Sequence, residues 1–279
     1  MKTEALHLKE FYPFLGHDAC DPVLTMYLPY NMPEMPQENI KRPCILICPG
    51  GAYAMCSQRE SEPVALHYLT AGYNVFVLHY SPCPQRDPRQ RLEVAAALEL
   101  LYAHAEDWHC DTSRIVLLGF SAGGHLAAYY CNTYDAPAIR QIFPDSKPVR
   151  ATILGYPVIT ADPAWTHQPS IEHLLGYYPT DEAGLAAVSC DRLVRPDTPP
   201  AFLWHTSTDG SVPVMNSLLY AEALTRRHIP FEMHVYPCGG HGLATADEHT
   251  CSEAELYGCT GRAHRWLTES CHWLAWILH

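Results

Sequence analysis

The chain has 279 residues, of which 48% are hydrophobic and 17% are charged, and its formal net charge is −12. No Gly/Ser-rich linker or charge run divides it, and α/β folds of roughly 250 residues often form one domain. We therefore expect a single domain over residues 1–279. The acidic balance argues against nucleic acid or an anionic membrane as a partner, since both attract basic surfaces. The sequence leaves the oligomeric state open, including a homodimer.

The N-terminal 14 residues carry Lys2, Glu4 and Lys9 and no apolar run, so they do not resemble a signal peptide. No stretch reaches the roughly 18 apolar residues of a membrane span. We therefore expect a cytoplasmic protein. The twelve cysteines include no C-x-x-C pair, and we expect them to be buried or incidental free thiols.

Short apolar runs alternate with longer amphipathic segments along the chain. The runs predict strands at residues 44–48, 74–79, 114–119, 149–156, 201–207 and 231–236. The longer segments predict helices at residues 61–71, 88–108, 123–131, 214–227 and 261–278. This alternation is typical of an α/β fold with a mainly parallel sheet and helices on both faces, in which ligands bind beyond the carboxyl ends of the strands.

Residues 157–199 break this rhythm, with only a short helix expected at 170–175. They are rich in proline and aromatic residues. We interpret them as a small cap or lid insertion over the ligand site.

Residues 119–123 read Gly-Phe-Ser-Ala-Gly, which matches G-x-S-x-G between an expected strand and an expected helix. In this context the pattern indicates a nucleophile elbow with Ser121 as the nucleophile. The glycines are needed because the tight turn crowds the backbone two residues to either side of the serine. The turn also directs the Ala122 N–H, at a helix N-terminus, towards a developing oxyanion.

A serine hydroxyl needs a base, and the partners in this arrangement follow in the order Ser, Asp or Glu, His. Asp209 follows the expected strand 201–207 and is the candidate acid, with Asp162 as a competitor. His241 lies among glycines just after the expected strand 231–236, where a loop can bring its imidazole to the serine.

The oxyanion hole needs at least two backbone donors. Residues 49–53, Pro-Gly-Gly-Ala-Tyr, follow a strand in the position of the HGGG-type motif, and we assign Gly51, Ala52 and Ala122 as donors. There is no H-E-x-x-H motif, and the remaining His and Cys residues do not form a convincing metal-binding set.

Residues 119–127 (Gly-Phe-Ser-Ala-Gly-Gly-His-Leu-Ala), 48–53 and 59–63 (Arg-Glu-Ser-Glu-Pro) together resemble the esterase/lipase branch of the α/β hydrolases. More narrowly, they resemble the bacterial acetyl esterase and acetyl-xylan-esterase-like, xylanase-associated group. This chain has Pro49 where many relatives have His, and Ala52 where they often have a third Gly. The resemblance implies an α/β-hydrolase fold with about eight strands, the triad Ser121, Asp209 and His241, and no cofactor. It implies hydrolysis of short-chain acyl esters of small molecules, including acetylated carbohydrates.

Two alternatives remain open. One is a serine peptidase or amidase, although the residue after the nucleophile is the small Ala122 where the prolyl-oligopeptidase-like branch usually has an aromatic residue. The other is a non-catalytic small-molecule-binding scaffold, which does not require an intact triad.

The expected pocket residues are less specific. Tyr53 and Arg59 lie beside the oxyanion loop in the sequence, and Arg59 either binds an acidic substrate group or pairs with Glu60 or Glu62. Trp165, Tyr177 and Tyr178 in residues 157–199 either stack on a sugar or pack internally.

Overall fold

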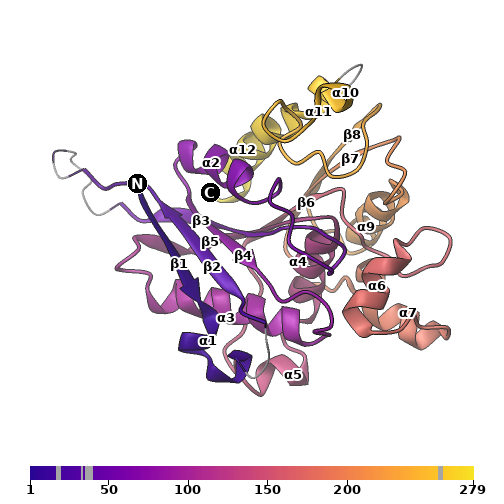
Figure 1. The fold of residues 1–279 in the computed structure, drawn as a ribbon, viewed down its shortest axis with the longest axis horizontal. Coiled ribbons are helices and arrows are strands. Elements are labelled where there is room, and N and C mark those ends of the chain that lie inside the picture. Colours follow the sequence, from indigo (N-terminus) through magenta and orange to yellow (C-terminus); the bar gives the residue numbers. More distant parts are fainter. Residues whose placement is uncertain (17–19, 33, 35–39, 257–259) are drawn as a thin grey trace.

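The computed structural model describes residues 1–16, 20–32, 34, 40–256 and 260–279. Its centre is an eight-stranded sheet in the order β1-β2-β4-β3-β5-β6-β7-β8 (Figure 1). The strands are β1 (Lys2–His7), β2 (Val23–Leu28), β3 (Arg42–Cys48), β4 (Asn74–His79), β5 (Cys110–Phe120), β6 (Ala151–Gly155), β7 (Ala201–Thr206) and β8 (Phe231–Tyr236). The strands β4, β3, β5, β6, β7 and β8 pair in parallel, whereas β2 pairs antiparallel to both β1 and β4. The expected mainly parallel sheet is therefore confirmed.

Helices cover both faces of the sheet (Figure 1). The helices are α1 (Leu8–Phe11), α2 (Glu62–Thr70), α3 (Arg89–Ala103), α4 (Ser121–Thr133), α5 (Pro137–Arg140), α6 (Gln168–Leu175), α7 (Glu182–Val188), α8 (Cys190–Leu193), α9 (Met215–Arg226), α10 (Glu253–Leu256), α11 (Thr260–Ala263) and α12 (Arg265–Ile277), with a short 3-10 turn η1 (Pro13–Gly16). Helices α2 and α12 pack on one face, and α3, α4 and α9 pack on the other. Burial on both faces explains why the central strands are apolar runs.

Strand β3 shows how the sheet separates two hydrophobic layers. Its side chains alternate in direction. Cys44, Leu46 and Cys48 therefore join the layer with α3 and α4, while Ile45 and Ile47 join the layer with α2 and α12. All five side chains are fully buried.

The antiparallel edge formed by β1 and β2 was not among the strands predicted from the sequence. The side chains of β1 are exposed or half-buried, so the strand has no apolar run. Lys2 and Glu4 in fact form an ion pair on this edge strand. Charged side chains on an edge strand discourage pairing with other chains.

Residues 157–199, which we call the β6–β7 segment, contain α6, α7 and α8.

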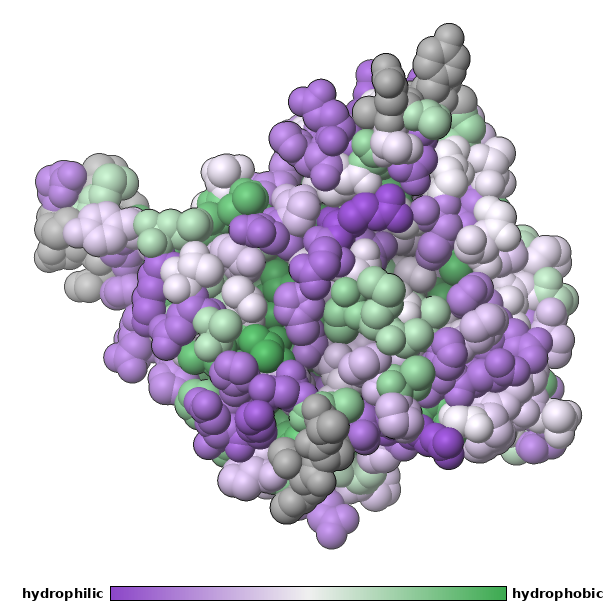
Figure 2. All heavy atoms as spheres, viewed as in Figure 1, coloured by the Kyte–Doolittle hydropathy of each residue, from purple (hydrophilic) through white to green (hydrophobic). Residues whose placement is uncertain are grey.

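The described residues include no helix that is both long enough and apolar enough to span a membrane. In the view of Figure 2, hydrophilic residues are spread over the surface, and the hydrophobic ones gather in small areas between them.

Candidate active site

Ser121 lies at the sharp turn where β5 ends and α4 begins, in a left-handed backbone conformation with φ 52°. The flanking glycines are required by close backbone contacts. A Cβ on Gly119 would lie 2.2 Å from the Gly123 carbonyl oxygen, and a Cβ on Gly123 would lie 2.1 Å from the Cys48 carbonyl oxygen. The crowding that the motif predicts is therefore present, and it holds the Ser121 hydroxyl beyond the carboxyl end of the sheet.

The structure brings Ser121, His241 and Asp209 together from the loops that follow β5, β8 and β7. His241 Nε2 lies 2.8 Å from Ser121 Oγ, and His241 Nδ1 lies 2.7 Å from Asp209 Oδ2. Asp162, the competing acid, instead accepts a hydrogen bond from the Ala164 N–H in its own turn.

The Asp209 carboxylate is fixed from several sides. Its Oδ1 accepts hydrogen bonds from the N–H groups of Ser211 and Val212, both at 2.9 Å. Burial opposes the ionised form, but hydrogen bonds from the nearby His205 and His241 outweigh it and hold the pKa of Asp209 well below its usual range. Asp209 is therefore a permanent anion that can orient His241 and stabilise its protonated form.

A buried glutamate supports the loop after β3. Glu60 is 3% exposed. Its Oε2 accepts the Gly50 N–H at 2.7 Å, and its Oε1 accepts the Tyr156 hydroxyl at 2.7 Å. Burial raises the pKa of Glu60. From the sequence, Glu60 was expected only as part of the motif 59–63 and as a possible partner of Arg59, so its role in supporting this loop is new.

Tyr156 carries this network on to the histidine loop. Its hydroxyl oxygen accepts the Ala244 N–H at 2.9 Å. Its ring packs edge-on against the imidazole of His241, with centroids 5.0 Å apart. Glu60 and Tyr156 thus connect the loop after β3 to the loop that carries His241.

Ser121 and His241 open onto a cavity of about 390 Å³. Gly51 and Ala52 line it, and their N–H groups donate no hydrogen bond to another described residue. His173 Nδ1, from α6, donates to the Ala52 carbonyl at 2.8 Å and helps to hold this loop. Ala122, at the first turn of α4, is the third expected donor and follows Ser121 directly.

Four of the expected pocket residues do not line this cavity within the described part of the chain. Tyr53 is fully buried, and its hydroxyl is 2.8 Å from His125 Nδ1, because its left-handed φ of 57° turns the side chain into the core. Tyr177 is 60% exposed, and Trp165 is 40% exposed with its carbonyl bound by Asn216. Tyr178 packs internally and donates its hydroxyl to the Ala161 carbonyl at 2.5 Å.

Arg59 does line the cavity. Its guanidinium donates to the Thr250 carbonyl at 3.2 Å and lies 3.5 Å from Glu255 Oε1. The expected pairing with Glu60 or Glu62 is wrong, because the arginine crosses to the segment that follows the histidine loop. Further residues that were not predicted line the cavity, among them His167 and Ser211, which no local sequence pattern marks as site residues.

Cys238 is disulfide-bonded, three residues before His241. The expectation of free thiols is therefore wrong for this cysteine, although the buried cysteines carry free thiols as expected: Cys44, Cys48, Cys110, Cys131, Cys190 and Cys251.

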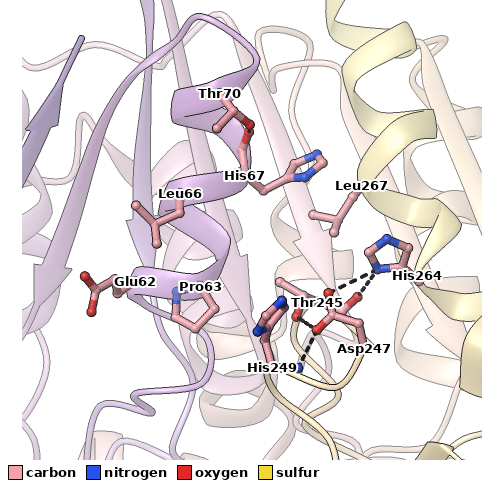
Figure 3. A pocket seen from close by; sticks show the side chains of 10 residues that line it. All are labelled: Glu62, Pro63, Leu66, His67, Thr70, Thr245, Asp247, His249, His264 and Leu267. Atoms are coloured by element: carbon pink, nitrogen blue, oxygen red, sulfur yellow. Dashed lines mark hydrogen bonds and ion pairs between the residues drawn. The ribbon is translucent and has the colours of Figure 1, made fainter. Parts of the chain in front are cut away.

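A second cavity, of about 480 Å³, lies between α2 and the chain from Thr245 to α12 (Figure 3). His67, His249 and His264 line it together with Asp247. The Asp247 carboxylate is already bound by the Thr245 hydroxyl and the His249 N–H. No group of three or more ligating side chains in the described residues is arranged to hold a metal ion.

Comparison with known proteins shows where this chain belongs. The BD-FAE family matches residues 28–224. Endo-1,4-beta-xylanase B of Butyrivibrio fibrisolvens is 36% identical over 80% of this chain and 36% of its own length. Acetylxylan esterase of Xylanibacter ruminicola is 30% identical over 74% of this chain and 42% of its own length. The crystal structure of an acetyl ester-xyloside bifunctional hydrolase from Caldicellulosiruptor lactoaceticus is 33% identical, with a TM-score of 0.82 over 98% of this chain and 96% of that one.

This chain belongs to the BD-FAE family. The expected α/β-hydrolase fold is confirmed by the sheet and by the solved structures that match almost the whole chain. The chain spans well under half the length of these two curated relatives. The BD-FAE match includes Ser121 and Asp209 but ends before β8, so the position of His241 is known here from the structure.

Proposed function

We propose that the protein is a serine ester hydrolase that removes short acyl groups, chiefly acetyl, from small molecules, including acetylated carbohydrates. The observation that carries this proposal is the continuous hydrogen-bond chain from Ser121 Oγ through His241 to Asp209. The Ser121 end of this chain opens onto the cavity, where the N–H groups of Gly51 and Ala52 have no described partner. The names of the acetylxylan esterase and acetyl ester-xyloside hydrolase relatives support acetyl as the acyl group.

In the first half of the reaction, His241 Nε2 takes the Ser121 proton as Oγ forms a bond to the ester carbonyl carbon. The carbonyl oxygen becomes an oxyanion, which the N–H groups of Gly51, Ala52 and Ala122 stabilise. As the tetrahedral intermediate collapses, the ester C–O bond breaks and His241 gives its proton to the leaving alcohol.

In the second half, water attacks the acyl-enzyme on Ser121 while His241 takes a proton from the water. Collapse of the second intermediate releases the acid, and the proton returns to Ser121 Oγ. Asp209 stays ionised throughout and holds the His241 ring in position. The residues of the β6–β7 segment act as a small cap over this site in our proposal, with His167 at the cavity.

The experiment is hydrolysis of p-nitrophenyl acetate, butyrate and octanoate by wild type and Ser121→Ala, with p-nitroacetanilide as the amide counterpart of the acetate. We expect acetate turnover that falls with chain length and vanishes in the variant. Faster turnover of the amide than of the ester would favour a peptidase or amidase. Absence of turnover in folded wild type would favour a non-catalytic binding scaffold.

A further inference from the structure

His167 is a second imidazole in the cavity that holds Ser121 and His241. It lies in the β6–β7 segment, directly before α6. It lines the same cavity as Ser121 and His241, and the charges of His241 and Asp209 both influence its pKa. His167 cannot replace the base in this structure, because His241 Nε2 already occupies the hydrogen-bond position at Ser121 Oγ.

One ring nitrogen of His167 is fixed by its own turn. Nδ1 lies 2.9 Å from the hydroxyl of Ser170, which is fully buried, and the Ser170 N–H donates to the His167 carbonyl at 3.0 Å. These contacts set the orientation of the ring. Its Nε2 has no hydrogen-bond partner among the described residues, so a ligand in the cavity can bind it.

The chemistry of this nitrogen selects one kind of ligand group. Burial, together with the nearby His241, lowers the pKa of His167, which favours the neutral ring. A neutral imidazole presents either a donor or an acceptor at Nε2, depending on which partner donates in the Nδ1–Ser170 hydrogen bond. A hydroxyl group can pair with either form because it both donates and accepts.

The position of His167 also indicates which part of an ester it meets. His241 must protonate the leaving alcohol, so the alcohol lies on the His241 side of Ser121. Ser211, whose N–H is bound to Asp209, also lines the cavity. The polar groups around His241 therefore face the alcohol rather than the acyl group.

We propose that His167 Nε2 binds a hydroxyl of the alcohol part of the ester and makes the enzyme selective for esters of polyhydroxylated alcohols, such as sugars. This inference rests on the proposed esterase function. His167 is then a specificity-determining residue that contacts the substrate, whereas proton transfer remains with His241.

The test compares three substrates: a mono-acetylated methyl xyloside with free hydroxyls, the same compound with those hydroxyls methylated, and p-nitrophenyl acetate. The readout is the ratio of kcat/KM for the hydroxylated ester to that for each of the other two. We expect His167→Ala to lower both ratios about five- to tenfold, the usual net value of one hydrogen bond. His167→Asn, which keeps a polar group, should recover part of the loss.

His249→Ala is the matched control, because this exposed histidine lines the second cavity (Figure 3). It should leave both ratios unchanged. Unchanged ratios in His167→Ala, or equal losses on all three substrates, would overturn the proposal. If the variants fail to fold, the wild-type enzyme still tests the proposal: equal kcat/KM for the hydroxylated and methylated xylosides would contradict it. Failure of the esterase function is distinct, since wild type would then hydrolyse none of the three.

Discussion

Asp209 and His241 share a 2.7 Å hydrogen bond between Oδ2 and Nδ1, and the second carboxylate oxygen is bound by two backbone N–H groups. The carboxylate therefore cannot rotate away without breaking contacts in its own loop. This arrangement fixes the tautomer of His241 that leaves Nε2 free to accept the Ser121 proton.

Asp209→Asn should lower kcat for p-nitrophenyl acetate by about 10³- to 10⁴-fold, because the amide can favour the wrong imidazole tautomer and carries no charge. Asp162→Asn is the matched control, since Asp162 only accepts a hydrogen bond within its own turn. Steady-state kinetics of both variants provide the check. A larger loss in Asp162→Asn would mean that the acid has been assigned to the wrong residue.

Gly123→Ala should damage both stability and activity. The added Cβ would lie 2.1 Å from the Cys48 carbonyl oxygen and 2.3 Å from that of Pro49. These are backbone atoms, so the clash can be relieved only if the loop that carries Gly51 moves. We expect a loss of about 1–3 kcal/mol or more in the free energy of unfolding, measured in urea. Gly210→Ala, where a Cβ meets nothing within 4 Å, should stay within about 0.5 kcal/mol of wild type. Equal stability of the two variants would contradict the steric explanation.

Glu60→Gln should lower kcat about ten- to a hundredfold with a smaller change in KM. Loss of one oxyanion-hole donor lowers kcat about a hundredfold or more, and in this variant the donors of the loop after β3 are displaced rather than removed. Glutamine cannot accept from both Gly50 and Tyr156, so one contact is lost. The neighbouring Glu62 is exposed, and Glu62→Gln should change neither constant. A wild-type kcat in Glu60→Gln would show that Glu60 does not position this loop.

The stability of Glu60→Gln relative to wild type should depend on pH. Burial raises the pKa of Glu60 in the folded protein. The contribution of such a carboxyl to stability is complete below its unfolded pKa, about 4.3, and is lost as pH rises through the folded value. Glutamine does not titrate, so the unfolding free energy of Glu60→Gln should rise relative to that of wild type between about pH 4 and pH 7. Urea titrations across this range measure it, and a constant or falling difference would show that Glu60 does not titrate as its burial predicts.

The sequence predicted what local patterns encode. The central strands and the triad could be predicted because each element has its own apolar run and each triad residue follows a strand. Strand β1 was missed because its exposed side chains lack such a run. Tyr53 was misplaced because adjacency to Gly51 and Ala52 in the chain does not reveal the left-handed φ that turns it into the core. His167 lies 46 residues from Ser121 in the chain, and only the path of the β6–β7 segment brings it to the cavity.

The hydrogen bond from His173 to the Ala52 carbonyl limits how this fold can diversify. Insertions between strands are natural places for recombination, and exchange of the β6–β7 segment offers a direct route to a new substrate range. In this protein, however, the exchanged piece would also take away a support of the loop that carries Gly51 and Ala52. A chimera with a foreign segment should therefore lose turnover along with its old preference unless the donor brings an equivalent of His173.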